Sequence, residues 1–168
     1  MILYRNIFPI IPIILVLACS TKQVLFVDYS NGQIEYAGRI DSSKVKGAEL
    51  HWSGTAIKLN FEGHDISALL EDEKGDNYYN VVIDQDSLFI LRPDTTKRYY
   101  QLASDLPKGK HTIEIFKRTE WDRGKTVFHG FKIEGDPKVI SKPPPNKRKI
   151  EFYGNSITAG YAVEDTSG

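Results

Sequence analysis

The chain has 168 residues and a mass of 19.1 kDa, and its 22 basic side chains balance its 22 acidic ones. This balance excludes a strong cationic field, so the composition predicts no nucleic-acid partner. With 26% charged and 40% hydrophobic residues, the chain has enough apolar material for a core and lacks the composition of a disordered protein. Its single cysteine excludes an intramolecular disulfide and a thiolate metal cluster.

Residues 1–18 have the pattern of a signal peptide. One cation, Arg5, precedes an apolar run over 7–17. That run is about half of the roughly 20 residues that a membrane-spanning helix requires, and Pro9 and Pro12 interrupt it. We therefore expect a cleaved targeting segment rather than an anchoring helix.

The only cysteine, Cys19, follows this segment directly, in the sequence Val16-Leu17-Ala18-Cys19. This sequence resembles the lipobox of bacterial lipoproteins, although Leu17 stands where a smaller residue is commoner. The resemblance implies that Cys19 is a lipid attachment site whose acyl chains hold the protein on a membrane. It also implies a location in the bacterial cell envelope, at the outer membrane or facing the periplasm, or secretion. The alternative is an incidental or buried cysteine after an ordinary signal peptide.

Residues 19–140 are predicted to form one β-sandwich. Between 24 and 140 no stretch of ten residues has a convincing helical period, whereas short β-branched and aromatic runs alternate with turn residues. The expected strands are 24–29, 34–38, 48–52, 56–62, 65–71, 78–83, 88–91, 98–104, 109–117 and 126–134. So many strands in roughly 115 residues favour an antiparallel jelly roll over a smaller immunoglobulin-like sandwich.

Residues 141–149 are predicted to be a linker. Three consecutive prolines, at 143–145, cannot donate to a strand ladder, and four cations without an acid keep the segment solvated. A phosphate-binding patch is the alternative, but the segment has no interleaved aromatic residues to support it.

Residues 150–168 are predicted to begin a second domain. The run over 150–153 is typical of a short strand, and the next residues are typical of a turn into a helix. Gly154 permits a sharp turn, after which Ser156 would present its hydroxyl at a helix N-terminus, beside free backbone amides. That environment suits a nucleophile whose reaction produces an oxyanion. From spacing alone, a structural turn with a capping serine is an equal alternative.

The segment Gly154-Asn155-Ser156-Ile157-Thr158-Ala159-Gly160-Tyr161 resembles the first motif of the SGNH (GDSL-type) hydrolases, with Asn155 in place of the more usual aspartate. The preceding region is similar to the N-terminal jelly-roll domain of carbohydrate esterase family 2. Segments spread over roughly 100 residues carry this second similarity: 36–39, 52–54, 60–63, 77–84, 117–120 and 128–131. The two resemblances imply a jelly-roll β-sandwich followed by the truncated start of an α/β SGNH domain.

The implied activity is the removal of acetyl groups from polysaccharides such as xylan or glucomannan, through an acetyl-serine intermediate. By resemblance, Ser156 is the nucleophile and its backbone amide is one oxyanion donor. No metal or organic cofactor is implied. The catalytic histidine and the other oxyanion donors are expected beyond Gly168, in a further ~170 to 200 residues, a length typical of one domain. We therefore expect the chain of 168 residues to be inactive by itself.

A non-catalytic β-sandwich lipoprotein that binds glycans or proteins is the alternative function. The four histidines are predicted to lie on strand faces or in turns, away from Ser156: His51, His64, His111 and His129. Exposed aromatic rings can stack on sugar rings, and the candidates are Trp52, Tyr78, Tyr79, Tyr99, Tyr100 and Trp121. Trp121, in a predicted loop, is the expected substrate-binding residue, and most of the others are expected in the core.

Overall fold

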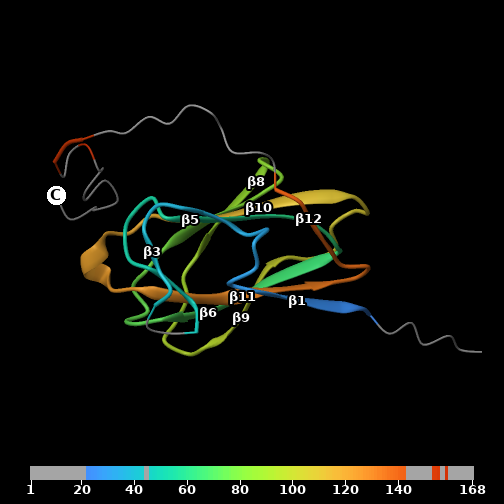
Figure 1. The fold of residues 1–168 in the computed structure, drawn as a ribbon, viewed down its shortest axis with the longest axis horizontal. Helices are drawn as coiled ribbons and strands as arrows, with labels where there is room; N and C mark the ends of the chain where they lie inside the picture. The colour runs from blue at the N-terminus through green and yellow to red at the C-terminus, as the bar shows by residue number, and fades with distance from the viewer. Residues whose placement is uncertain (1–21, 44–45, 143–152, 156–157, 159–168) are drawn as a thin grey trace, which may run out of the picture.

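The computed structural model describes residues 22–43, 46–142, 153–155 and 158. Two six-stranded sheets lie face to face (Figure 1), and every strand pairing in this part of the chain is antiparallel. The architecture confirms the prediction of an all-β, antiparallel sandwich of the jelly-roll kind. Residues 150–152 of the strand predicted after the linker lie outside the described residues.

The first sheet, called sheet A here, has the strand order β3-β4-β11-β6-β9, and β1 pairs with the same edge of β11 as β4. In Figure 1 this sheet is the lower layer. Its strands are β1 (Val24–Asp28), β3 (Ile40–Asp41), β4 (Ala48–Leu50), β6 (Asp65–Asp72), β9 (Arg98–Ala103) and β11 (Thr126–Glu134).

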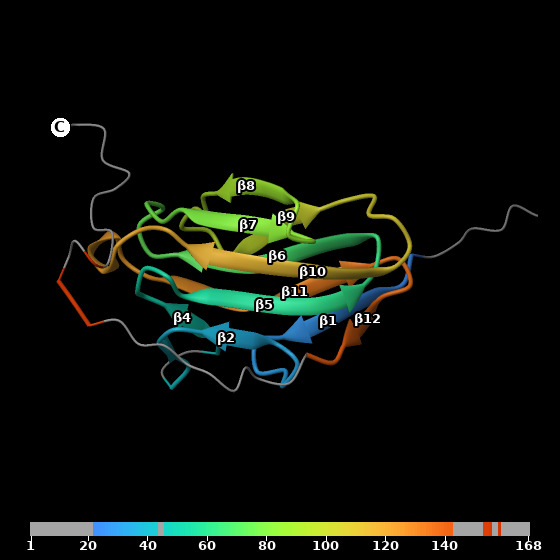
Figure 2. The ribbon, with the colours of Figure 1, turned by 90° about the horizontal axis from the view of Figure 1, so that it is seen from above.

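The second sheet, sheet B, has the order β12-β5-β10-β7-β8, and β2 shares one edge of β5 with β12. Figure 2 looks down on this sheet and shows β2 and β12 end to end beside β5. Its strands are β2 (Glu35–Ala37), β5 (Ala56–Glu62), β7 (Tyr79–Ile83), β8 (Ser87–Leu91), β10 (Lys110–Lys117) and β12 (Lys138–Ile140).

The core lies between the sheets and follows from period-two alternation along their central strands. In β5, Ile57, Leu59 and Phe61 are buried, and the residues between them are half-buried. Phe128 and Phe131 of β11 enclose the core from sheet A, with ring centroids 4.8 Å apart. Because successive side chains of a strand point to opposite faces, each central strand contributes one apolar row to the core and one row to an outer face.

Three short elements were not predicted. Strands β3 and β12 have two and three residues, too few to show an alternating pattern, and each exists by pairing with a longer neighbour. The predicted loop around Trp121 contains a single 3-10 turn, η1 (Trp121–Arg123). This turn projects from one end of the sandwich in both views (Figures 1 and 2). That end carries the loops in which the candidate site lies.

Candidate functional site

Ser156 and Cys19 lie outside the described residues, so their predicted roles stay predictions. Close to Ser156, the structure describes Gly154 and Thr158. A Cβ atom at Gly154 would overlap the Thr158 side chain, so a residue other than glycine would require that side chain to shift. The turn predicted after Gly154 includes residues outside the described part of the chain and stays a prediction.

Trp121 is exposed, with 63% of its surface accessible, and it does not stand alone. Trp52, in the loop between β4 and β5, is 44% exposed, and its ring centroid lies 6.5 Å from that of Trp121, with the ring planes at 37°. The guanidinium of Arg39 lies 5.6 Å from the Trp52 ring centroid. Two indole rings from loops far apart in the sequence therefore form one exposed aromatic surface, the tryptophan pair.

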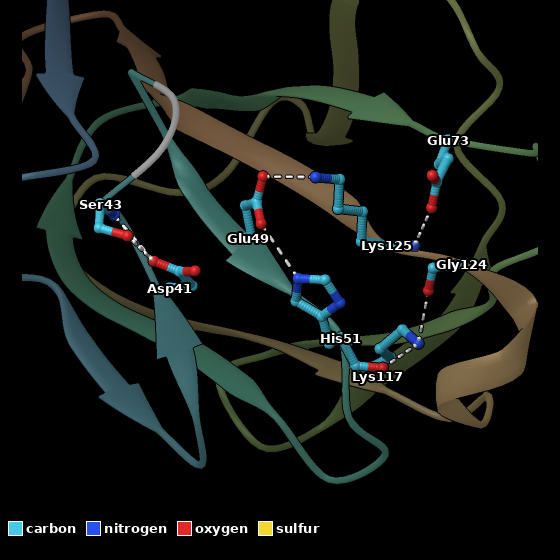
Figure 3. A network of polar contacts seen from close by, with 8 residues as sticks. All are labelled: Asp41, Ser43, Glu49, His51, Glu73, Lys117, Gly124 and Lys125. Atoms are coloured by element: carbon cyan, nitrogen blue, oxygen red, sulfur yellow. Dashed lines mark hydrogen bonds and ion pairs between the residues drawn. The ribbon is translucent and has the colours of Figure 1, made fainter.

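Lys117, the last residue of β10, links the loop that carries Trp52 to the loop that carries Trp121. Its side chain is fully buried, and Nζ donates to the carbonyl oxygen of His51 at 2.9 Å. The carbonyls of Glu120 and Thr119 lie 3.1 and 3.3 Å from the same atom. The carbonyl of Gly124, drawn with Lys117 in Figure 3, lies at 3.5 Å. Burial lowers the pKa of Lys117 to about 8. The ammonium group thus occupies a cage of loop carbonyls and links the loop that carries Trp52 to the loop that carries Trp121.

A buried carboxylate of sheet A, Glu49, holds the loop that contains His51 and Trp52. Glu49 of β4 is buried, and it accepts hydrogen bonds from Lys125 Nζ at 2.6 Å and from His51 Nε2 at 3.0 Å (Figure 3). Burial raises the pKa of Glu49, but the hydrogen bonds and charges of Lys125 and His51 outweigh this and lower it overall. The side chain of His51 is thereby fixed beside Trp52, while its carbonyl binds Lys117.

Asp72, at the end of β6, holds the β6–β7 loop, the third loop at the end of the sandwich where the tryptophan pair lies. Its carboxylate accepts hydrogen bonds from Asn77 Nδ2 at 2.9 Å, from the Gly75 amide at 2.6 Å and from the Thr126 hydroxyl. The Thr119 hydroxyl in turn donates to Asn77 Oδ1 at 2.6 Å. The β6–β7 loop is therefore tied to the loop that carries Trp121, which makes the tryptophan pair a preorganised surface.

All four histidines have partners within the sandwich, as their predicted places on strands and turns imply. The contacts are His51 with Glu49, His64 with the Leu106 carbonyl, His111 with Asp84 and the Pro107 carbonyl, and His129 with the Lys46 carbonyl. Within the described residues no group of histidines, cysteines and carboxylates is arranged to hold a metal ion. In this part of the chain, no helix has the length and apolarity that crossing a bilayer requires.

The prediction that most of the other aromatic candidates lie in the core was wrong. Tyr79 and Tyr100 are buried, but Trp52, Tyr78 and Tyr99 are exposed. Exposure was missed because Trp52 and Tyr78 lie in loops, where period-two alternation does not apply. Phe26 was not considered at all, although its position between Leu25 and Val27 puts it on the opposite face from both.

A family model described as carbohydrate esterase 2 N-terminal matches residues 36–143, which include both sheets except β1. The chain belongs to this family. The match contains both tryptophans and the Lys117 cage, and it ends at the start of the predicted linker. The relatives and solved structures similar to the chain are carbohydrate esterases, so it belongs to a family of ester hydrolases.

Two relatives illustrate the family. The cellulase/esterase CelE of Acetivibrio thermocellus is 37% identical over 140 residues, which are 83% of this chain and 17% of the relative. An acetylxylan esterase / glucomannan deacetylase of Cellvibrio japonicus is 22% identical over 156 residues, 90% of this chain and 43% of the relative. The chain thus spans less than half the length of either.

Two solved structures of family two carbohydrate esterases are also similar to the chain. A family two carbohydrate esterase from Clostridium thermocellum, in complex with cellohexaose, is 37% identical with a TM-score of 0.70 and covers 80% of this chain and 41% of that chain. A family two enzyme from Cellvibrio japonicus has a TM-score of 0.79 at 21% identity, over 88% of this chain and 44% of that chain. The second match shows a common fold.

Proposed function

We propose that this chain is the N-terminal part of a serine esterase that removes acetyl groups from polysaccharides such as xylan or glucomannan. The observation that carries the proposal is the order of parts in one chain. A sandwich of the carbohydrate esterase 2 N-terminal family is followed, after a proline-rich segment, by the serine motif Gly154-Asn155-Ser156. A module that only bound a ligand would have no need of that motif.

In the proposed reaction, Ser156 Oγ attacks the acetyl carbonyl and loses its proton to a histidine that lies outside these 168 residues. The bond to the sugar oxygen breaks, the sugar takes up that proton, and the acetyl group remains on Oγ until water hydrolyses it. The Ser156 amide would stabilise the oxyanion. Without a general base the serine hydroxyl is a weak nucleophile, so the chain alone should be inactive.

The tryptophan pair is the proposed contribution of the sandwich to substrate binding. Trp121 and Trp52 expose flat apolar faces that match the C–H faces of sugar rings, and the Lys117 cage holds both loops in place before the glycan arrives. In both views residues 153–155, coloured red, lie beyond the end of the sandwich from which η1 projects (Figures 1 and 2). We propose that the glycan passes the tryptophan pair on its way to Ser156.

The proposed location is outside the cytoplasm, on the cell envelope, through a lipid on Cys19. Its support is the order of the N-terminal sequence, in which an apolar segment too short for a membrane span ends at the chain's only cysteine. A polysaccharide substrate would be met on that side of the membrane.

Acetate release by the full-length protein tests the esterase function. Acetylated glucomannan, acetylated xylan and 4-nitrophenyl acetate are the substrates, and Ser156→Ala should lower turnover by at least about 10³-fold. Ser87→Ala, at an exposed position of β8, is the matched control and should leave turnover unchanged. Undiminished turnover in Ser156→Ala would remove this serine from the mechanism.

The exposed tryptophan pair also favours a second function, that of a non-catalytic glycan-binding lipoprotein. The same experiment separates the two. If the full-length wild-type protein binds acetylated glucomannan but releases no acetate, then the binding function holds and the esterase proposal fails.

A further inference from the structure

The outer face of sheet A carries a second pair of exposed aromatic rings, which lie on strands rather than in the loops of the tryptophan pair. Phe26 of β1 is 64% exposed and Tyr99 of β9 is 40% exposed. Their ring centroids lie 6.5 Å apart with the planes at 45°, although β11 and β6 separate their strands. The two side chains therefore lean toward each other across the two central strands of the sheet.

A hollow of about 300 Å³ lies beside these rings, and its lining includes both rings together with Gly130 and Leu69. The strand register places both residues in one row with Tyr99. Gly130 has φ of 141°, and a Cβ atom there would overlap the Val27 carbonyl oxygen, so no other residue fits without a shift of the backbone. The register also shifts between Phe128 and Gly130, and this irregularity re-aims the strand at the hollow.

Asp28 and His129 are the polar side chains that line the hollow, and further charged groups lie close to the Tyr99 ring. Asp28 is held in place because its Oδ1 accepts hydrogen bonds from the Ser30 amide at 2.9 Å and the Ser30 hydroxyl at 2.6 Å. Lys132 lies next to the lining rather than in it: its Nζ is 5.2 Å from the Tyr99 ring centroid and 2.7 Å from Glu134 Oε1. Since carboxylates and ammonium groups are present together, the border suits a neutral ligand with many hydroxyl groups rather than an ion.

We propose that this hollow, the Phe26–Tyr99 site, binds a hexose unit of a neutral polysaccharide. The aromatic faces would stack on the sugar ring, and Asp28 and Lys132 would hydrogen-bond its hydroxyls. The choice of a polysaccharide rests on the proposed function, but the site uses residues other than those of the tryptophan pair. It would hold the polymer on sheet A while the other end of the sandwich presents acetyl groups for cleavage, and so raise the effective substrate concentration.

The size and border of the site favour a sugar over another protein. A stable protein interface buries about 800 Å² on each partner, around a contiguous apolar centre. Here the exposed large apolar side chains are the two rings, with Asp28 in the lining and the Lys132–Glu134 ion pair next to Tyr99. A single sugar ring, with one apolar face and an equatorial belt of hydroxyls, is complementary to such an arrangement.

The test measures binding in the full-length protein with Ser156→Ala, so that no turnover occurs. Cellohexaose and unacetylated glucomannan are the ligands, because neither depends on recognition of an acetyl group. Phe26→Ala with Tyr99→Ala should weaken retention by glucomannan in affinity electrophoresis by about tenfold or more, whereas Tyr99→Phe should keep most of the affinity. On titration with cellohexaose, the backbone amide signals of Gly130 and Leu69 should shift in the parent protein and not in the double variant.

Phe116→Ala, an exposed aromatic of β10 on the outer face of sheet B, is the matched control and should bind like the parent protein. Unchanged retention and an absent amide shift in the parent protein would overturn the proposal. The lipid alternative is measured in a Cys19→Ser background, which has no lipid anchor. If the Phe26→Ala, Tyr99→Ala double variant keeps its glycan affinity but loses binding to phosphatidylcholine vesicles there, the proposal also fails, because the rings would then contact lipid. Because acetate release is not read, failure of the esterase function and failure of this site are distinguishable.

Discussion

Lys117 Nζ donates a hydrogen bond to the carbonyl oxygen of His51 at 2.9 Å, and this contact crosses from one sheet toward the other at the end of the sandwich. The same nitrogen donates to the carbonyl of Glu120 at 3.1 Å. His51 directly precedes Trp52, and Glu120 directly precedes Trp121. One buried ammonium group therefore sets the spacing of the two exposed tryptophans. A buried residue, Lys117, thus positions the exposed tryptophan pair.

Lys117→Met should destabilise the fold by about 2 to 4 kcal/mol. Methionine has a similar length but no donor, so the carbonyls around Nζ would lose the hydrogen bonds of the ammonium group. Urea unfolding followed by circular dichroism measures the loss, and tryptophan fluorescence of the folded variant should change because both indoles lose their support. Lys110→Met, at an exposed position on the same strand, should change stability by less than about 0.5 kcal/mol. Equal effects of the two substitutions would contradict the role given to the cage.

His111 should make stability depend on pH near neutrality. Its Nδ1 lies 2.7 Å from Asp84 Oδ2 and its Nε2 lies 2.8 Å from the Pro107 carbonyl oxygen. Both partners are acceptors when Asp84 is ionised, so both ring nitrogens donate only in the protonated imidazole. Burial lowers the pKa of His111, but the hydrogen bonds to Asp84 and Pro107 raise it overall above 6.5.

Because the folded-state pKa of His111 lies above its unfolded value, its contribution is complete below about pH 6.5 and is lost as pH rises through the folded value. Asp84, whose pKa is lowered, loses its own contribution as pH falls below about 3.8. We expect His111→Gln to cost about 1 to 2 kcal/mol at pH 6 and less at pH 9, measured by urea unfolding. A cost that is the same at both pH values would show that the ring is neutral in the folded protein.

Trp121→Ala should weaken glycan binding by about tenfold and leave stability within about 0.5 kcal/mol, because the ring is mostly exposed. Affinity electrophoresis in acetylated glucomannan, with the full-length Ser156→Ala protein, measures the first effect, and thermal unfolding measures the second. Leu88→Ala, at a position of β8 that is 62% exposed, is the control for loss of a large apolar side chain. Binding as tight as that of the control would remove Trp121 from the glycan site.

Cys19→Ser should release the protein from the membrane fraction of the cells that make it. Serine keeps the size of the side chain but cannot form the thioether that carries the lipid, and two or more acyl chains are what makes such anchoring stable. Fractionation followed by immunoblotting measures the change, and a Ser20→Ala variant should stay with the membranes. Retention of the Cys19→Ser protein there would contradict the lipid anchor.

The long strands were predictable because their alternation is a local property. In β5 and β11 the predicted bounds, 56–62 and 126–134, agree with the structure at both ends. Strand β12 was missed because its three residues owe their conformation to hydrogen bonds with β5, which lies far away in the sequence. A strand pairing over such a distance has no local signature.

The amino-acid sequence by itself determined the all-β class, the long strands and the family resemblance, because alternation, turn residues and motif spacing are written along the chain. Only the tertiary structure decided which aromatic rings are exposed and which of them meet. Trp52 and Trp121 are 69 positions apart, and Phe26 and Tyr99 are 73 apart, yet each pair has ring centroids 6.5 Å apart. The order in which strands pair across each sheet brings these rings together, and pairing order depends on how the whole core packs.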